Sequence, residues 1–185
     1  MKVWELSTLE IGYSPYHLPE EDKVESFIQL MDKINDEAKR VDEEWEPLIL
    51  LKSEQCIDPD FFDLLDTGAL IVSKQGCVLF QMFFNESEVE LLPFLNDENE
   101  FFLIHLIKSV DCLDKENSIF EALDNGIISD YDSLAFDYDK IKKEPVFRIP
   151  ELPYTIFVTS DFKYHYDELG LKGIDFDDEN LVFID

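Results

Sequence analysis

The excess of acidic residues is the feature that most constrains this chain. Asp and Glu number 43 against 15 Lys and Arg, which gives a formal net charge of −28 on 185 residues. A folded domain with this charge must tolerate its own electrostatic repulsion, and its field repels nucleic acid and anionic lipid while attracting basic surfaces. We therefore expect no binding to nucleic acid or to membranes, and a basic protein surface as the partner.

The composition nevertheless predicts a folded protein. Hydrophobic residues make up 45% of the chain and aromatic residues 14%, whereas chains that stay disordered are poor in both. The length suits a single domain over residues 1–185. The polar run at 96–100 also allows a division into two lobes, a helix-containing α/β lobe at 1–95 and a sheet-rich lobe with a short helix at 96–185.

Targeting signals and cysteine usage favour the cytoplasm. Residues 1–5 form no basic and apolar leader, and the longest mostly apolar stretch, 101–107, is far shorter than the roughly 20 residues of a membrane helix. Cys56, Cys77 and Cys112 are an odd, scattered set without a CxxC spacing. We expect them to be small buried thiols in a reducing compartment rather than a disulfide framework.

Hydrophobic periodicity predicts an α+β fold. Apolar residues recur at steps of three and four over 20–41, which predicts an N-terminal amphipathic helix. A short helix is expected at 61–65, a strand buried on both faces at 101–107, and shorter strands at 118–123, 133–138 and 146–149. Asn125–Gly126 is a hairpin turn signal. A strand, a hydroxyl cap, a helix and a second strand follow one another at 69–92 and again at 155–176, so we expect a mixed sheet with two recurring strand–helix–strand units and a sheet-rich C-terminal half.

The sequence contains no convincing catalytic or metal-binding motif. His17, His105 and His165 have no metal-ligand spacing, and there is no phosphate-binding glycine loop or GxSxG elbow. The acidic run at 175–180 lacks the glycine of a calcium loop, and Glu151 with 161–163 only loosely resembles a nuclease site. We expect no enzyme activity, no catalytic residue, no metal and no cofactor, with His105 in the core and Arg148 in a structural ion pair.

The second half resembles a bacterial immunity-protein family of polymorphic toxin systems, long known only as a domain of unknown function. The segments that carry the resemblance are 111–120 (DCLDKENSIF), 145–149 (PVFRI), 155–162 (TIFVTSDF) and 170–176 (GLKGIDF). Together with weaker upstream elements they cover roughly residues 59–176. The resemblance implies a non-enzymatic protein that binds and neutralises a cognate toxin. The matched positions are mostly apolar, glycine or turn residues, so we expect them to be fold determinants, and the resemblance itself assigns no toxin contact to them.

Three functions follow from these observations. The first is an immunity protein that forms a stoichiometric complex with a toxin through its acidic surface. The second is an acidic adaptor or nucleic-acid mimic that binds another basic protein, and the third is a small enzyme with an unrecognised site. The chain is expected to be a monomer or a dimer.

Clustered carboxylates with neighbouring tyrosines are the candidate contacts, although a solvated acidic face gives the same pattern. Alternation at 137–139 is expected to put two carboxylates on one strand face, and tyrosine is enriched at protein interfaces. The candidate residues are Asp130, Tyr131, Asp132, Asp137, Tyr138 and Asp139, and near the C-terminus Asp175, Asp177, Asp178 and Glu179.

Overall fold

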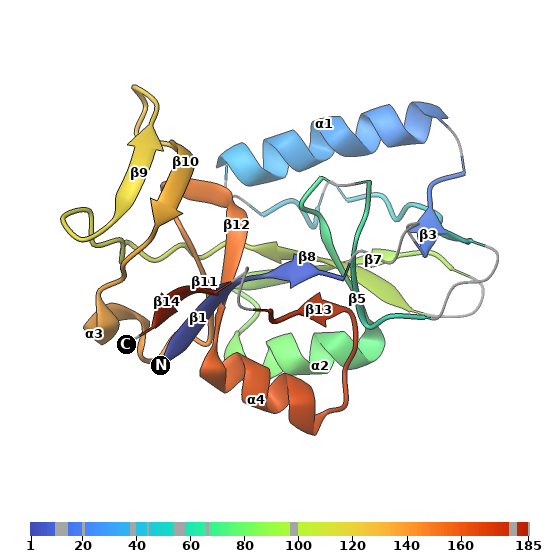
Figure 1. Cartoon of the computed structure of the whole chain (residues 1–185). Coiled ribbons are helices and arrows are strands. Elements are labelled where there is room, and N and C mark those ends of the chain that lie inside the picture. Colours follow the sequence, from blue (N-terminus) through green and yellow to red (C-terminus); the bar gives the residue numbers. More distant parts are fainter. Residues whose placement is uncertain are drawn as a thin grey trace. The chain divides into compact units, whose positions relative to one another are not determined.

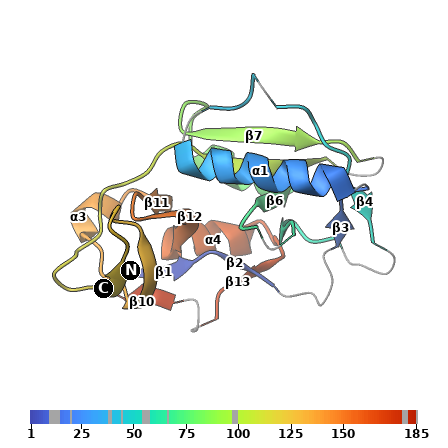
Figure 2. The ribbon, with the colours of Figure 1, turned by 90° about the horizontal axis from the view of Figure 1, so that it is seen from above.

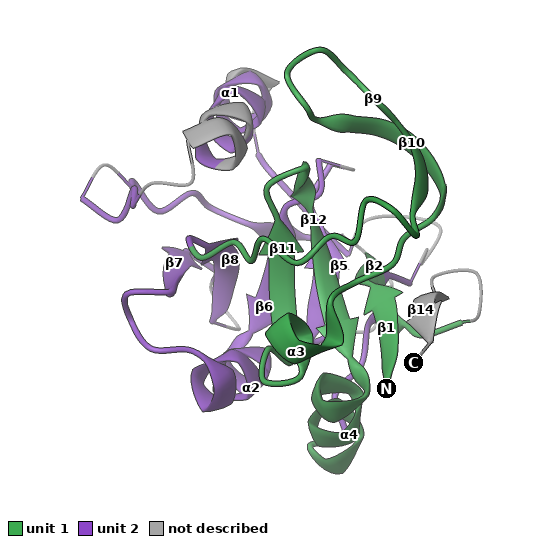
Figure 3. Cartoon of the chain, turned by 90° about the vertical axis from the view of Figure 1, so that its left-hand side faces the viewer, with its two compact units in different colours: residues 1–7, 108–169, 175–185 green, residues 8–107, 170–174 purple. Residues whose placement is uncertain are grey.

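The structure, a computed structural model, describes residues 1–9, 15–19, 21–37, 40–43, 45–53, 58–65, 67–96, 100–177 and 181–184. These residues form four helices and many antiparallel strands, which confirms the α+β class. Two compact units share the chain (Figure 3). Unit 1 contains residues 1–7, 108–169 and 175–185, and unit 2 contains residues 8–107 and 170–174. The chain passes from unit 1 to unit 2 between residues 7 and 8, within the short strand β2 (Ser7–Thr8). It passes from unit 2 to unit 1 between residues 174 and 175, within the short strand β13 (Ile174–Asp175).

Unit 2 is built on a four-stranded antiparallel sheet with a helix on each face. The strand order is β5 (Phe61–Asp63), β6 (Leu70–Ser73), β8 (Phe101–Leu106) and β7 (Val89–Phe94). Helix α1 (Glu21–Glu37) lies over one face and α2 (Lys74–Phe83) over the other (Figure 1). Viewed from above, α1 runs along β7 (Figure 2). A small pair of strands, β3 (Tyr16–His17) and β4 (Leu51–Lys52), completes the unit.

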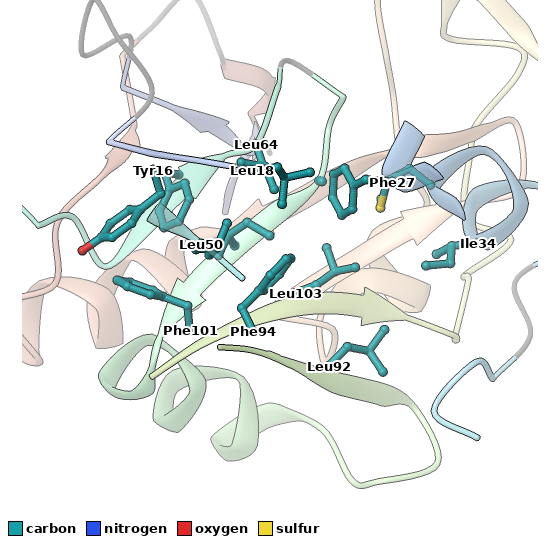
Figure 4. Packing of buried hydrophobic residues seen from close by; sticks show 14 of the residues in the cluster. Tyr16, Leu18, Phe27, Ile34, Leu50, Leu64, Leu92, Phe94, Phe101 and Leu103 are labelled. Atoms are coloured by element: carbon teal, nitrogen blue, oxygen red, sulfur yellow. The ribbon is translucent and has the colours of Figure 1, made fainter. Parts of the chain in front are cut away.

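The α1 face of the sheet holds the core of unit 2. Phe27, Met31 and Ile34 of α1 are buried, at the spacing of one helical face. Figure 4 shows Phe27 and Ile34 lying over residues of β7 and β8. The larger cluster also includes Tyr16, Leu18, Leu50, Phe62, Leu64, Ile71, Leu92, Phe94, Phe101 and Leu103. Strand β8, expected to be buried on both faces, lies between β6 and β7 and is almost wholly buried.

Helix α2 starts where its cap residue predicts. The Ser73 hydroxyl accepts a hydrogen bond from the Gly76 N–H at 3.1 Å, which satisfies one of the free donors of the first turn. Gly76 allows close packing, because a Cβ there would stand 3.0 Å from the Cβ of Val72 and 3.1 Å from the carbonyl oxygen of Asp60. The Phe80 ring packs against the Phe61 ring in a tilted arrangement, with centroids 6.2 Å apart and an interplanar angle of 37°.

Unit 1 has a four-stranded antiparallel sheet of its own. The order is β11 (Val146–Ile149), β12 (Leu152–Thr159), β1 (Lys2–Glu5) and β14 (Leu181–Ile184). Helix α4 (Ser160–Glu168) follows β12 and is capped by the Thr159 hydroxyl. The buried cluster of this unit includes Val3, Cys112, Leu113, Ile128, Leu134, Phe136, Ile141, Phe147, Ile149 and Phe157. A separate two-stranded sheet is formed by β9 (Ile119–Ala122) and β10 (Ile128–Ser133).

Three sequence predictions about the elements are wrong. Instead of one mixed sheet, the described residues form two four-stranded sheets, each antiparallel, because β8 lies between β6 and β7 and keeps these two like-directed strands apart. The helix expected at 61–65 is strand β5, because its backbone bonds to β6 and to Lys172, far along the chain. The strand expected at 133–138 ends at Ser133, and helix α3 (Tyr138–Ile141) begins after Asp137.

The described cysteines are buried thiols, as expected. Cys77 and Cys112 are free and buried, and burial raises the pKa of each thiol to about 12. Cys56 lies outside the described residues. Among the described residues, no helix combines the length and the apolar character needed to cross a membrane.

Candidate partner-binding surface

The β9–β10 hairpin carries the first group of candidate residues. Asn125 and Gly126 lie in the turn that joins the strands, and Gly126 has a φ of +85°, which favours glycine. The Leu123 N–H donates to the Ile127 carbonyl at 2.8 Å, and the Ile127 N–H donates to the Asn125 side-chain oxygen at 3.1 Å. These local bonds explain why the sequence turns here.

Three contacts attach the hairpin to the rest of unit 1. Ile128 is buried in the unit 1 cluster, and its N–H donates to the Glu151 carbonyl at 2.8 Å. Phe120 packs against the same cluster. The Tyr131 hydroxyl donates to the Glu5 carboxylate, and burial together with this hydrogen bond raises the pKa of Tyr131. Tyr131 was expected to offer its ring to a partner, but it is half-buried and its hydroxyl is already engaged.

The outward surface of the hairpin is acidic with exposed apolar side chains. Glu121, Asp124, Asp130 and Asp132 are all exposed, and residues 119–133 contain no Lys, Arg or His. Ile119 is 61% exposed and Leu123 is 56% exposed. Sequence reasoning singled out Asp130 and Asp132 but missed Glu121, Asp124, Ile119 and Leu123. The absence of any base between 119 and 133 was the signal that marks the whole hairpin.

The second group, Asp137, Tyr138 and Asp139, lies at α3 rather than on a strand. The Asp137 carboxylate caps the helix by accepting from the Asp139 N–H at 3.0 Å. Lys142 lies 2.6 Å from Asp139 and lowers the pKa of that carboxyl. Tyr138 is 46% exposed, so its ring is the exposed aromatic of this group. Because the cap turns the chain into a helix, the strand alternation expected for Asp137 and Asp139 does not apply.

The third group lies near the C-terminus and is described only in part. Asp175 is half-buried and accepts from the Asp177 N–H at 3.0 Å, and Asp177 is exposed. Between them Phe176 packs edge-on against Trp4, with ring centroids 5.7 Å apart, and beneath the Lys163 ammonium at 4.6 Å. Asp178 and Glu179 lie outside the described residues.

The residues of the loose nuclease pattern have other partners. Glu151 pairs with Lys115 at 2.7 Å, while Lys163 pairs with Asp167 at 2.9 Å. Within the part of the chain that the structure describes, no three His, Cys, Asp or Glu side chains gather as metal ligands would.

Two buried charged residues differ in how well they are paired. Glu90 lies 2.7 Å from His105, and both are buried, which places His105 in the core as expected. Arg148 is 4% exposed, and the hydrogen bond seen for its guanidinium runs to the Pro153 carbonyl at 3.4 Å. The ion pair expected for Arg148 is missing among the described carboxylates, and burial lowers the pKa of Arg148.

Comparison with known proteins gives a family match for this chain. The model of the immunity protein family (Imm11) matches residues 81–180, which is more than half of the chain. The matched region contains the β9–β10 hairpin, α3 and Asp175 with Asp177. No match was found among curated proteins. The family resemblance expected from the ordered segments of the second half is therefore confirmed, and the chain belongs to the immunity protein family Imm11.

Proposed function

We propose that this protein neutralises a cognate bacterial toxin by binding it in a stoichiometric, non-enzymatic complex through an acidic surface. The observation that carries this proposal is the β9–β10 hairpin, whose exposed carboxylates have no basic residue among them. Membership of an immunity protein family supports a toxin as the partner. The toxin would belong to a polymorphic toxin system, and the complex would form in the bacterial cytoplasm without nucleic acid or membrane.

Electrostatics gives the acidic hairpin a kinetic role. Opposite potentials raise association rates to about 10⁸–10⁹ M⁻¹s⁻¹ at low salt, compared with about 10⁵–10⁶ M⁻¹s⁻¹ for neutral surfaces. An inhibitor of a catalytic toxin benefits from rapid capture, since each free toxin molecule acts many times. We infer that the partner surface of the toxin is basic.

The candidate residues take different roles in this proposal. Asp130 and Asp132, with Glu121 and Asp124, attract the toxin, while Tyr131 holds the hairpin in place through Glu5. Tyr138 offers an exposed ring beside Asp137 and Asp139. We propose Asp175, Asp177, Asp178 and Glu179, near the C-terminus, as a second group of carboxylates that attracts the toxin.

We infer that the N-terminal amphipathic helix and the two strand–helix–strand units are framework rather than contact elements. Support comes from the buried faces of α1 and α2, where Phe27, Met31 and Phe80 are almost fully buried. Helix α1 is the next surface to test if the acidic groups prove dispensable.

A pair of charge-matched variants tests the function. In the hairpin variant, Glu121→Gln, Asp124→Asn, Asp130→Asn and Asp132→Asn remove four exposed carboxylates. In the control, Glu25→Gln, Glu43→Gln, Glu46→Gln and Glu86→Gln remove four exposed carboxylates from unit 2. Both sets have the same effect on net charge, so a difference between them reports location.

The toxin to use is the C-terminal domain encoded beside the immunity gene, produced as a purified protein. The hairpin variant should associate about tenfold or more slowly at low salt, with a flatter salt dependence, and the control should match the wild type. Failure of the wild-type protein to bind the toxin or to protect cells that produce it would refute the function. Unchanged association after neutralising both the hairpin and the C-terminal group would refute the surface assignment alone.

The same acidic surface also fits the alternative, an adaptor or nucleic-acid mimic. In that case the wild-type protein would not bind the toxin encoded beside its gene, and it would bind a DNA-binding protein in competition with duplex DNA.

A further inference from the structure

Strand β9 is an open sheet edge. Its sheet contains only β9 and β10, and no backbone hydrogen bond joins the outer side of β9 to any other described residue. Two other edges have such bonds. The Val110 N–H donates to the Arg148 carbonyl of the edge strand β11 at 2.8 Å, and just after β7 the Leu95 N–H donates to the Leu48 carbonyl at 2.9 Å. In Figure 1 the hairpin extends away from the four-stranded sheet of unit 1.

The turn determines which groups of β9 face outward. Because the Leu123 N–H donates to Ile127, Leu123 has its backbone groups directed at the partner strand. These groups alternate along an antiparallel strand, so Glu121 and Ile119 also face β10, whereas Phe120 and Ala122 face away. The Ser129 hydroxyl, which donates to the Glu121 carbonyl at 3.3 Å, agrees with this assignment. Both irregularities of register fall in β10, so the alternation along β9 is uninterrupted.

The outer edge of β9 is protected by charge alone. Native edge strands are commonly guarded by charged side chains, Pro or a bulge. Strand β9 has no Pro and no bulge, and its one charged residue, the exposed Glu121, repels acidic strands but not basic ones; Ile119 and Ala122 are exposed as well. Its outward N–H and C=O groups at Phe120 and Ala122 can therefore accept another strand.

Charge selects the strand that fits. The hairpin has four carboxylates and no base, so a basic strand complements it. A second copy of this chain would bring its own Glu121 and neighbouring acids against the first set, and like charges on paired strands are destabilising.

We propose that an extended basic segment of the cognate toxin pairs with β9 and becomes the third strand of the hairpin sheet. This inference rests on the proposed toxin-binding function and specifies its geometry. Backbone bonds at Phe120 and Ala122 would hold the segment, while Ile119 and Glu121 would contact an apolar and a basic side chain of the toxin.

Substitution of Ala122 tests the edge directly. Ala122→Pro removes an outward N–H without removing any donor to β10, a position that an edge strand tolerates. Ala122→Val keeps the N–H and suits a strand. We expect the proline variant to bind the neighbouring toxin domain at least about tenfold more weakly, with the valine variant within about threefold of wild type.

Hydrogen exchange tests the same edge in the wild-type protein, so its result does not depend on whether a variant folds. In the free protein the Glu121 amide should be protected and the Phe120 and Ala122 amides should exchange rapidly. In the complex with the toxin domain, exchange at Phe120 and Ala122 should slow by at least about tenfold.

Each other outcome has a definite meaning. If the toxin binds and is neutralised while Phe120 and Ala122 still exchange rapidly, strand pairing is wrong and the immunity function stands. If these amides are protected without toxin and the protein sediments as a dimer, the occupant is a second copy. If the wild-type protein does not bind the toxin, both proposals fall.

Discussion

Glu90 lies in β7 with 2% of its surface exposed, and its carboxylate accepts several hydrogen bonds. The Val41 N–H donates at 3.0 Å and the Asp42 N–H at 2.9 Å, and His105 donates from Nδ1 at 2.7 Å because a carboxylate can only accept. The Arg40 Nε lies 3.5 Å away. One side chain thereby fixes the segment that follows α1 onto the sheet of unit 2.

Replacing Glu90 with Ala should reduce the free energy of unfolding by about 3 kcal/mol, because several buried donors lose their acceptor. Glu100→Ala is the matched control, since its ion pair with Lys74 is exposed and such pairs contribute about 0–1 kcal/mol. Urea unfolding of both variants measures the difference. Equal losses would show that Glu90 has no special role.

At the scale of elements, Gly173 shows how a distant partner shapes a strand. Its φ is +115°, and a Cβ on it would stand 2.1 Å from the Phe61 carbonyl oxygen of β5. The Lys172 carbonyl accepts from the Asp60 and Phe61 N–H groups at 2.9 and 3.1 Å. Residues 170–174, where the chain comes back to unit 2, therefore lie against β5.

Gly173→Ala should destabilise the protein strongly, because backbone and not a movable side chain fills the space. Gly170→Ala is the comparison, since Gly170 also has a positive φ, +65°, but nothing lies within 4 Å of its Cβ position. That variant should cost about 1 kcal/mol for the backbone conformation alone. Thermal unfolding of the pair separates contact from conformation, and similar melting temperatures would contradict the packing described for β5.

Local signals predicted elements well and long-range partners poorly. The Ser73 cap and the Asn125–Gly126 turn act within a few residues, and both lie where expected. Residues 61–65 have the apolar spacing of a short helix, yet β6 and Lys172 hold 61–63 extended. For the candidate surface, Asp130 and Asp132 stood out by composition, but the engagement of Tyr131 depends on Glu5, 126 residues earlier. The hydrogen bond between Tyr131 and Glu5 cannot be predicted from a single sequence, because no local pattern links two residues so far apart.

Each unit of the molecule is built from segments that lie far apart in the sequence, so neither the first nor the second half of the chain contains a complete unit. Strand β1 lies between β12 and β14, with Val3 paired to Thr159 on one side and to Phe183 on the other. Val3 is fully buried in the cluster of unit 1. Unit 1 therefore depends on the first residues of the described chain.

The fragment 108–185 should consequently fail to form unit 1, because the central position of its sheet is empty. Adding a peptide of residues 1–9 should restore dispersed amide signals in NMR spectra, whereas the same peptide with Val3→Asp should not, since that change buries a charge. A fragment that folds cooperatively on its own would refute the dependence on β1.

The position of β1 also has a consequence in time. Val3 is synthesised long before Thr159, and at 5–20 residues per second the ribosome needs roughly 8–30 s to make the intervening chain. Until then β1 has no strand to join, and the sheet of unit 1 cannot close. If the protein protects a cell against a toxin, protection lags behind the start of translation by at least that interval. A standing supply made before exposure suits this topology better than synthesis on demand.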